Sequence, residues 1–179
     1  MAAYRGRFQH RVFKIPIDQW RRLNKLTSKK NQGYRKFLKR ILNEVIAQSI
    51  KLEEELEEEL VQNLGRLKRF GYNLELYTDP KTQKAGRQLV CRGQGGRIDL
   101  LCSDGKKNQF VVVELKNVRA GQETFGQVFS YVGWVKKRIA GKTPVKGLVI
   151  SRGYDAKFQS ALNATNLIFH LDLKQLGFE

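Results

Sequence analysis

The chain has 179 residues, of which 41% are hydrophobic, so its composition supports a folded core and excludes general disorder. Its 34 Lys and Arg residues against 17 Asp and Glu residues give a formal net charge of +17, which points to a polyanionic partner, most often a nucleic acid. Two cysteines and two histidines are too few for a disulfide scaffold and form no zinc-binding motif.

Targeting signals are missing from the sequence as given. No apolar run approaches the roughly 18 residues of a membrane span, and the first residues carry no secretory signal. We therefore expect a cytoplasmic protein with no membrane partner and no small-molecule cofactor.

The first 50 residues form a basic segment, with 13 Lys and Arg but 2 Asp and Glu. Residues 8–15 roughly alternate between apolar and polar, which predicts a short strand that ends at Pro16. Asp18 is a candidate N-cap for a first helix, and Gly33 ends the break before a second. The second helix carries an apolar stripe at spacings of three and four: Tyr34, Phe37, Leu38, Ile41, Leu42, Val45 and Ile46.

This order of strand, helix, turn and helix over about residues 8–49 resembles the ribbon-helix-helix DNA-binding fold. The resemblance implies that two chains pair their strands and that the paired ribbon reads bases in the major groove. By position, the base readers would be His10, Val12 and Lys14, with Arg35 close to a phosphate at the start of the second helix. The alternative interpretation is a basic helical appendage that has no sequence preference.

A second helical stripe follows, in which Leu52, Leu56, Leu60 and Leu64 recur every four residues and predict helix to about Phe70. The stripe slips over residues 49–52, where one bent helix or two abutting helices would both fit. We place the domain boundary there, between a DNA-binding and dimerisation module (residues 1–50) and a second domain (residues 51–179). The six glutamates of residues 53–59 are expected mainly on a solvated helix face.

The second domain contains charged residues within apolar strands. Asp99 interrupts one apolar run, while Glu114 follows three valines and precedes Lys116 by two positions, so Glu114 and Lys116 project to the same side of a strand. Buried charges are costly unless they are paired or bind a metal. Two carboxylates suit Mg²⁺, and a nearby lysine can orient an attacking water. A buried ion pair at a sheet edge explains the same residues.

This spacing resembles the PD-(D/E)XK nuclease superfamily. Ile98-Asp99 is followed by fourteen residues and then by Glu114-Leu115-Lys116, with Ile98 in place of the name-giving proline. A helix with Gln127 and Tyr131 four residues apart comes next, as in the RecB-like nucleases and the archaeal-type mismatch endonucleases. The resemblance covers about residues 52–176.

The resemblance implies an α/β fold, a restriction-endonuclease-like αβββαβ core in which helices flank a mixed sheet. A further helix over 155–164 and a strand over 166–173 extend it. It also implies that Asp99, Glu114 and the Leu115 carbonyl hold Mg²⁺, for which Mn²⁺ can substitute, and that Lys116 positions the attacking water. Gln127 and Tyr131 would contact the DNA backbone or support the site. A glutamate of the first helix, Glu53 or, in reserve, Glu57, is a further implied site residue. Tyr131 and Trp134 would serve equally well as core aromatics.

Together these features favour a Mg²⁺-dependent endonuclease that cuts duplex DNA at a roughly palindromic site. A homodimer or a higher even oligomer would place one reading ribbon beside two active sites. Homing and restriction-like enzymes work in this way, so a nucleoid-associated protein or one encoded by a phage or mobile element is expected. The alternatives are a structure-specific endonuclease for mismatches, junctions or flaps, and a DNA-binding repressor with a decayed nuclease domain. RNA is also a possible substrate, since charge alone does not separate the two polymers.

Overall fold

The computed structural model describes residues 32–178, and within this range the side chains of all but residues 32–35 and 46–50. The predicted strand and first helix of the basic segment, with His10, Val12 and Lys14, therefore lie outside the described residues, as does the side chain of Arg35. The contacts of the chain divide it into two units, Met1–Leu52 and Glu53–Glu179.

A single helix, α2 (Gln32–Gln62), passes through this division. Of the two alternatives for residues 49–52, the structure has the continuous helix, because neither glycine nor proline occurs between Gly33 and Gly65. The α-helix does not reach Phe70 as predicted, since a 3₁₀ helix, η1 (Leu64–Phe70), follows instead. Asn63 and Gly65 are poor helix formers, and the Asn63 side chain donates to the Glu59 carbonyl at 2.9 Å.

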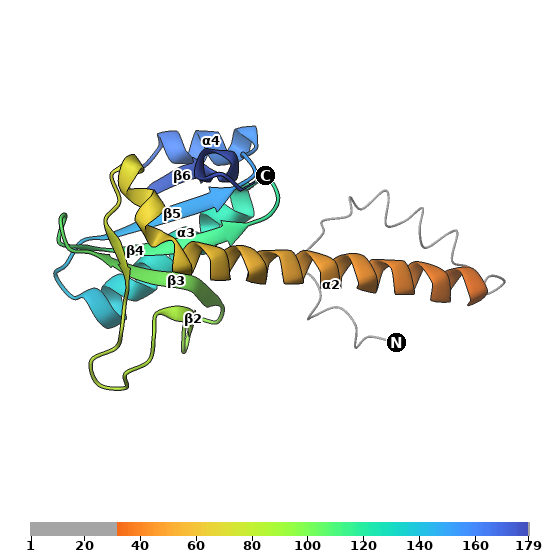
Figure 1. The fold of residues 1–179 in the computed structure, drawn as a ribbon, viewed down its shortest axis with the longest axis horizontal. Helices are drawn as coiled ribbons and strands as arrows, with labels where there is room; N and C mark the ends of the chain where they lie inside the picture. The colour runs from red at the N-terminus through yellow and green to blue at the C-terminus, as the bar shows by residue number, and fades with distance from the viewer. Residues whose placement is uncertain (1–31, 179) are drawn as a thin grey trace. The chain divides into compact units, whose positions relative to one another are not determined.

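The second unit is built on a six-stranded mixed sheet (Figure 1). The strands in sequence order are β1 (Leu74–Leu76), β2 (Arg87–Val90), β3 (Arg97–Asp104), β4 (Gln109–Lys116), β5 (Val145–Ser151) and β6 (Ile168–Asp172). The pairs β1–β3, β2–β3 and β3–β4 are antiparallel, whereas β4–β5 and β5–β6 are parallel. A mixed sheet with flanking helices agrees with the predicted α/β class.

Two short strands, β1 and β2, precede β3 and both pair with it. β1 pairs with residues 102–104 of β3, where Leu74 lies opposite Asp104 and Leu76 opposite Cys102. β2 pairs with residues 97–100 in the other half of β3. Residues 77–86 leave the sheet between them in a turn whose Asp79 Oδ1 accepts two backbone N–H groups at 2.8 Å. Gly86 closes the excursion, because its carbonyl accepts from Leu101 N at 2.6 Å.

Helices of the second unit cover both faces of the sheet. α3 (Gln122–Val135) ends in a π-helical turn, η2 (Lys136–Ala140), and connects β4 to β5. α4 (Ala156–Asn163) and a last 3₁₀ helix, η3 (Leu173–Leu176), flank β6. The predicted helix and strand near the C-terminus are thus both present, each shorter than expected.

Each face of the sheet has its own hydrophobic core. On one face the C-terminal half of α2 packs with η1 and η3 around Leu60, Leu67 and Leu173. On the other face α3 and α4 pack around Val128, Val149 and Phe158. Cys102 belongs to the first core and Cys91 to the second, and both are free buried thiols that pack as small core residues.

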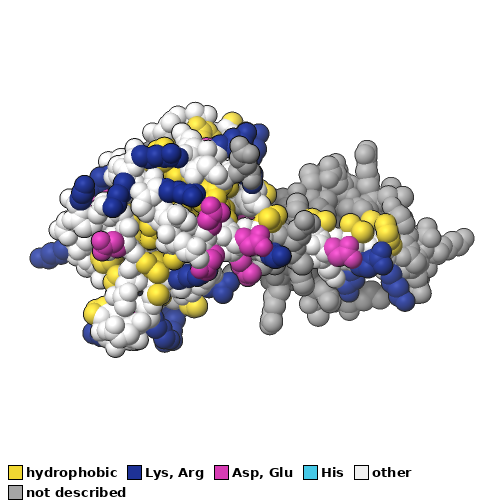
Figure 2. Space-filling view, viewed as in Figure 1, with side chains coloured by type: hydrophobic (Ala, Val, Ile, Leu, Met, Phe, Trp, Pro, Cys, Tyr) yellow, Lys and Arg dark blue, Asp and Glu magenta, His cyan; other side chains and the backbone are white. Residues whose placement is uncertain are grey.

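Among residues 32–178, no helix is both long enough and apolar enough to cross a bilayer. On the face of the second unit drawn in Figure 2, basic side chains occur at several separate places. The basic side chains visible on this face are therefore not gathered in one patch.

Candidate active site

Asp99, Glu114 and Lys116 meet where strands β3 and β4 separate. The regular pairing of the two strands ends at Leu100 and Val113. Beyond this point, Leu115 N–H donates to Asp99 Oδ2 at 2.9 Å, so a side chain replaces the backbone acceptor. Lys116 Nζ lies 2.7 Å from Glu114 Oε1. The separation of the strands makes room for charged side chains at the end of an otherwise apolar sheet.

Burial shifts the pKa values of Asp99, Glu114 and Lys116, because it removes their charges from water. Burial raises the pKa of Glu114, which is 1% exposed, and the nearby Asp99 raises it further. Burial also raises the pKa of Asp99, against the opposing effect of Lys116. For Lys116, burial alone would lower the pKa, but the carboxylates of Glu114, Asp99 and Glu53 together raise it. Lys116 is therefore held in its protonated form.

One carboxylate oxygen of this group, Glu114 Oε2, is buried without a hydrogen-bond partner. An orphaned buried acceptor beside a second carboxylate is a place where a cation would lower the free energy. The donor types present therefore fit a hard divalent ion. Within residues 32–178, however, no three acidic, histidine or cysteine side chains converge closely enough to form a ready-made metal cage.

Two glutamates of α2, four residues apart, lie near this group. The Glu53 carboxylate is close enough to raise the pKa values of Glu114 and Lys116. Glu57 is 5% exposed, and its charge contributes to the raised pKa of Asp99. Because residues i and i+4 share a helix face, both the first-choice and the reserve glutamate face the carboxylates of the sheet.

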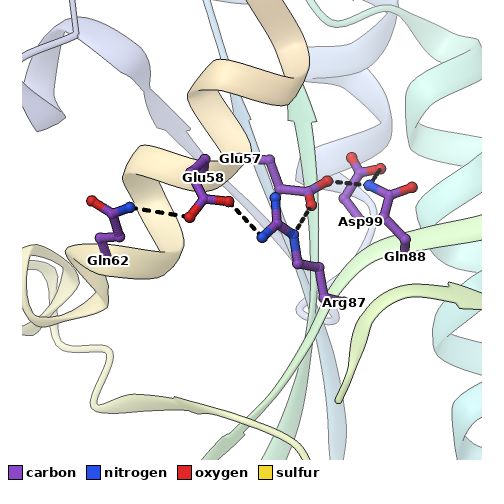
Figure 3. A network of polar contacts seen from close by, with 6 residues as sticks. All are labelled: Glu57, Glu58, Gln62, Arg87, Gln88 and Asp99. Carbon is purple, nitrogen blue, oxygen red and sulfur yellow. Dashed lines mark hydrogen bonds and ion pairs between the residues drawn. The ribbon is translucent and has the colours of Figure 1, made fainter. Parts of the chain in front are cut away.

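Sequence reasoning missed the contribution of β2 (Figure 3). Arg87 forms ion pairs with Glu57 at 2.5 Å and with Glu58 at 2.6 Å, and Gln88 donates to Glu57 and lies near Asp99. An Arg-Gln pair in a short strand is an ordinary sequence. The one signal in the sequence was the run of glutamates, since a run of like charges favours contact with a basic side chain. The run does not indicate which of the many basic residues makes this contact.

The α3 residues form a hydrogen-bonded pair beside the site. Gln127 Nε2 donates to the Tyr131 hydroxyl at 3.0 Å, and the same hydroxyl accepts from Arg97 N–H at 3.0 Å. Tyr131 is 4% exposed and packs in the α3-side core, while Trp134 donates to the Arg92 carbonyl at 3.2 Å. Tyr131 thus has the core position that was one of its two interpretations, with its hydroxyl turned to a polar contact.

His170 has a partner that the sequence did not indicate. Its Nε2 lies 2.8 Å from the hydroxyl of Ser151, a residue that pairs in register with Lys116 across β4 and β5. Ser151 is thus the register partner of Lys116 on β4 and the hydrogen-bond partner of His170 on β6.

Comparison with known proteins agrees with this architecture. Residues 77–174 match the family described as the endonuclease NucS C-terminal domain. A repair endonuclease from Pyrococcus abyssi is 21% identical with a TM-score of 0.53, and the match covers 68% of this chain and 46% of that one. The structure of EndoMS in a complex with double-stranded DNA is 22% identical with a TM-score of 0.51, and covers 67% and 44% respectively. No curated protein sequence matches.

The chain spans less than half the length of either solved structure, so the structural likeness establishes a shared fold. The family match carries more, because it includes Asp99, Glu114, Lys116 and the Gln127–Tyr131 pair and extends over more than half of the chain. The chain belongs to the endonuclease NucS C-terminal domain family.

Proposed function

We propose that this chain is a metal-dependent nuclease of the PD-(D/E)XK type that cleaves DNA at structural irregularities such as mismatches, junctions or flaps. The observation that carries the proposal is the grouping of Asp99, Glu114 and Lys116 where β3 and β4 separate. Membership of a family named for an endonuclease supports the reaction class.

In this proposal Asp99, Glu114 and the Leu115 carbonyl hold Mg²⁺, and Mn²⁺ can take its place. The bound cation would supply Lewis-acid stabilisation of negative charge on the scissile phosphate. Lys116 Nζ, which lies 2.7 Å from Glu114 Oε1, holds and orients the attacking water as a hydrogen-bond donor. Glu53 is the helix glutamate assigned to the metal site, with Glu57 beside it, and Gln127 supports the site through Tyr131.

The name of one similar structure, a repair endonuclease, favours irregular DNA over a fixed recognition sequence. The other similar structure is a complex with double-stranded DNA and favours neither substrate. The site-specific interpretation depended on the base readers His10, Val12 and Lys14, which lie outside the described residues. We therefore propose structure-specific cleavage in preference to cleavage at a palindromic site.

The proposal is tested with labelled duplexes of one sequence that are fully matched, singly mismatched, flapped or joined in a four-way junction. The full chain is incubated with each in Mg²⁺, Mn²⁺ or EDTA. We expect at least one irregular substrate to be cut about tenfold faster than the matched duplex, because an unpaired nucleotide is less costly to distort. EDTA should abolish cleavage.

Two variants address the site itself. Glu114→Gln and Lys116→Met should each slow cleavage by about a hundredfold or more. Asp104→Asn is the matched control, since Asp104 is also a buried carboxylate with an unpartnered Oδ2 but lies at the opposite end of β3. Its cleavage rate should equal that of the wild type.

Each other outcome has a distinct meaning. If matched and irregular duplexes were cut equally and the ends lay at one sequence motif, the protein would be a site-specific endonuclease. Undiminished cleavage by Glu114→Gln would show that the catalytic site lies elsewhere. A folded protein that binds DNA but cuts none of the substrates in either metal would support the repressor.

Dimerisation is a separate part of the proposal. Within the first unit, α2 exposes a run of large apolar side chains, which Figure 2 shows in yellow; Phe37 is 50% exposed and Val45 43%. We propose that a second copy of the chain covers this stripe, as the ribbon-helix-helix resemblance implies. Light scattering of the full chain should give twice the mass of the monomer. The Ile41→Asp variant, which places a charge within the stripe, should have the mass of one monomer.

A further inference from the structure

Two consecutive residues of β2 reach acidic side chains that belong to other elements (Figure 3). Arg87 Nε lies 2.5 Å from Glu57 Oε1, and the Gln88 amide nitrogen donates to Glu57 Oε2. Both oxygens of the buried Glu57 are therefore held from β2. The same Gln88 nitrogen lies 3.5 Å from Asp99 Oδ1.

The backbone of Gln88 explains how neighbouring residues reach one glutamate. Successive side chains of a regular strand point to opposite faces. Gln88 has a φ of 50°, in the left-handed region that residues other than glycine rarely adopt. This local turn of the chain brings Gln88 to the same side as Arg87, while Arg87 and Leu89 keep their register with β3. An unfavourable conformation of this kind is typical of functional sites.

We propose that Gln88 is a positioning residue, whose amide group fixes the orientation of the Asp99 carboxylate by bridging it to Glu57. Leu115 N–H already fixes Asp99 Oδ2, so the remaining rotation is set by the contact of Oδ1 with Gln88. The proposal rests on the proposed function, in which Asp99 holds a divalent cation.

An amide suits this position for two reasons. Its nitrogen carries two N–H donors, so a single side chain can serve two carboxylates. It is also neutral, so it orients Asp99 without competing with a cation for the charge, as a second lysine or arginine would. The 3.5 Å contact is long, as hydrogen bonds of active-site groups commonly are before the ligand binds.

Two substitutions separate the amide from the backbone. Gln88→Met keeps the length of the side chain and removes both donors. Gln88→Asn suits a positive φ better than glutamine but withdraws the amide by one methylene, so it keeps the fold while losing the bridge. Gln83→Met is the matched control, because Gln83 also has a positive φ of 56° and its amide donates to the Pro80 carbonyl and not to a carboxylate.

The test is calorimetric titration of the full chain with Mn²⁺ in the absence of DNA, with thermal unfolding and cleavage kinetics beside it. We expect both Gln88 variants to bind Mn²⁺ about tenfold more weakly, the usual effect of losing a residue that orients a metal ligand. Their kcat should fall while KM for DNA is unchanged. Gln83→Met should match the wild type in every measurement.

The inference and the proposed function fail in different ways. Wild-type Mn²⁺ affinity in both Gln88 variants, beside lost binding in Glu114→Gln, would overturn the role of Gln88 alone. A lower melting temperature of the variants with unchanged Mn²⁺ affinity would make Gln88 a purely structural residue. Failure of the wild-type chain to bind Mn²⁺ would overturn the metal-dependent function together with this inference.

Discussion

Two buried carboxylates of the sheet, Glu114 and Asp104, each leave one oxygen without a partner. Their surroundings differ, because Asp104 Oδ1 accepts from two backbone N–H groups of a tight turn, whereas Glu114 stands beside a second acid and a lysine. Burial of a carboxylate is therefore not enough to define a site. The convergence of like charges with one cation is what distinguishes the end of β3 and β4 that carries the proposed chemistry.

His170 is a residue whose protonation should affect stability. Its ring packs edge-on against Tyr154, with the centroids 4.7 Å apart, and against Phe158 at 5.9 Å. Burial lowers the pKa of His170 below its ordinary value of 6.5, although the charge of Asp172 opposes the shift. The unfolded chain therefore takes up the proton more readily than the folded protein does.

Acidification should for this reason destabilise the protein through His170. The contribution of His170 to the free energy of unfolding is fully present above about pH 6.5, the pKa of histidine in the unfolded chain. This contribution is lost as the pH falls towards the lower pKa of His170 in the folded protein, and it amounts to about 1.4 kcal/mol for each unit between these two pKa values. Between about pH 7.5 and pH 5.5, the melting temperature of the wild type should fall further than that of His170→Gln, which can still bond to Ser151. Parallel curves for the two proteins would contradict the prediction.

Among the elements, the crossing of α3 over β5 depends on a glycine. A Cβ added to Gly147 would lie 2.5 Å from Val128 Cγ1 and 3.3 Å from Ile168 Cγ1, both in the α3-side core. The lack of a side chain at Gly147 therefore sets how closely α3 approaches the sheet. This distance in turn positions Tyr131 of α3, whose hydroxyl accepts from Gln127 and from Arg97 N–H.

Gly147→Ala should accordingly lower the free energy of unfolding by about 1–3 kcal/mol, the usual cost of overpacking a core. Gly133→Ala is the matched control, because Gly133 lies in α3 with no atom within 4 Å of the added Cβ. Alanine is the better helix former, so this variant should gain up to about 1 kcal/mol. Urea titrations of both would show the opposite signs, and equal effects would argue against close packing at Gly147.

For the whole molecule, the net charge of +17 should govern binding to DNA. Affinity for a matched duplex should fall by about a thousandfold between roughly 50 and 200 mM salt, as for a protein that neutralises about six phosphates. Filter binding over a salt series with the slowly cleaving Glu114→Gln variant measures the slope with little cleavage. A slope near zero would contradict electrostatic contact with the backbone.

The sequence alone determined the elements and the motif of the second unit. Apolar runs located the strands around Asp99 and Glu114, and the Gln127–Tyr131 pair was placed correctly on one face of a helix. These predictions succeed because a strand buried on both faces is a continuous apolar run, and because residues four apart share one face of a helix. The extent of α2 was predictable only in part, since helix ends depend on single residues such as Asn63.

The tertiary structure decided which residues meet. No local pattern reveals that β1 and β2 share one side of β3, because the excursion over residues 77–86 joins them only through contacts with Gly86 and Leu101. The same holds for Gln88, which reaches Glu57 thirty-one positions earlier only because its backbone turns to positive φ. Chain periodicity specifies which side of an element is buried, whereas contacts between distant segments are set by the packing of the whole sheet.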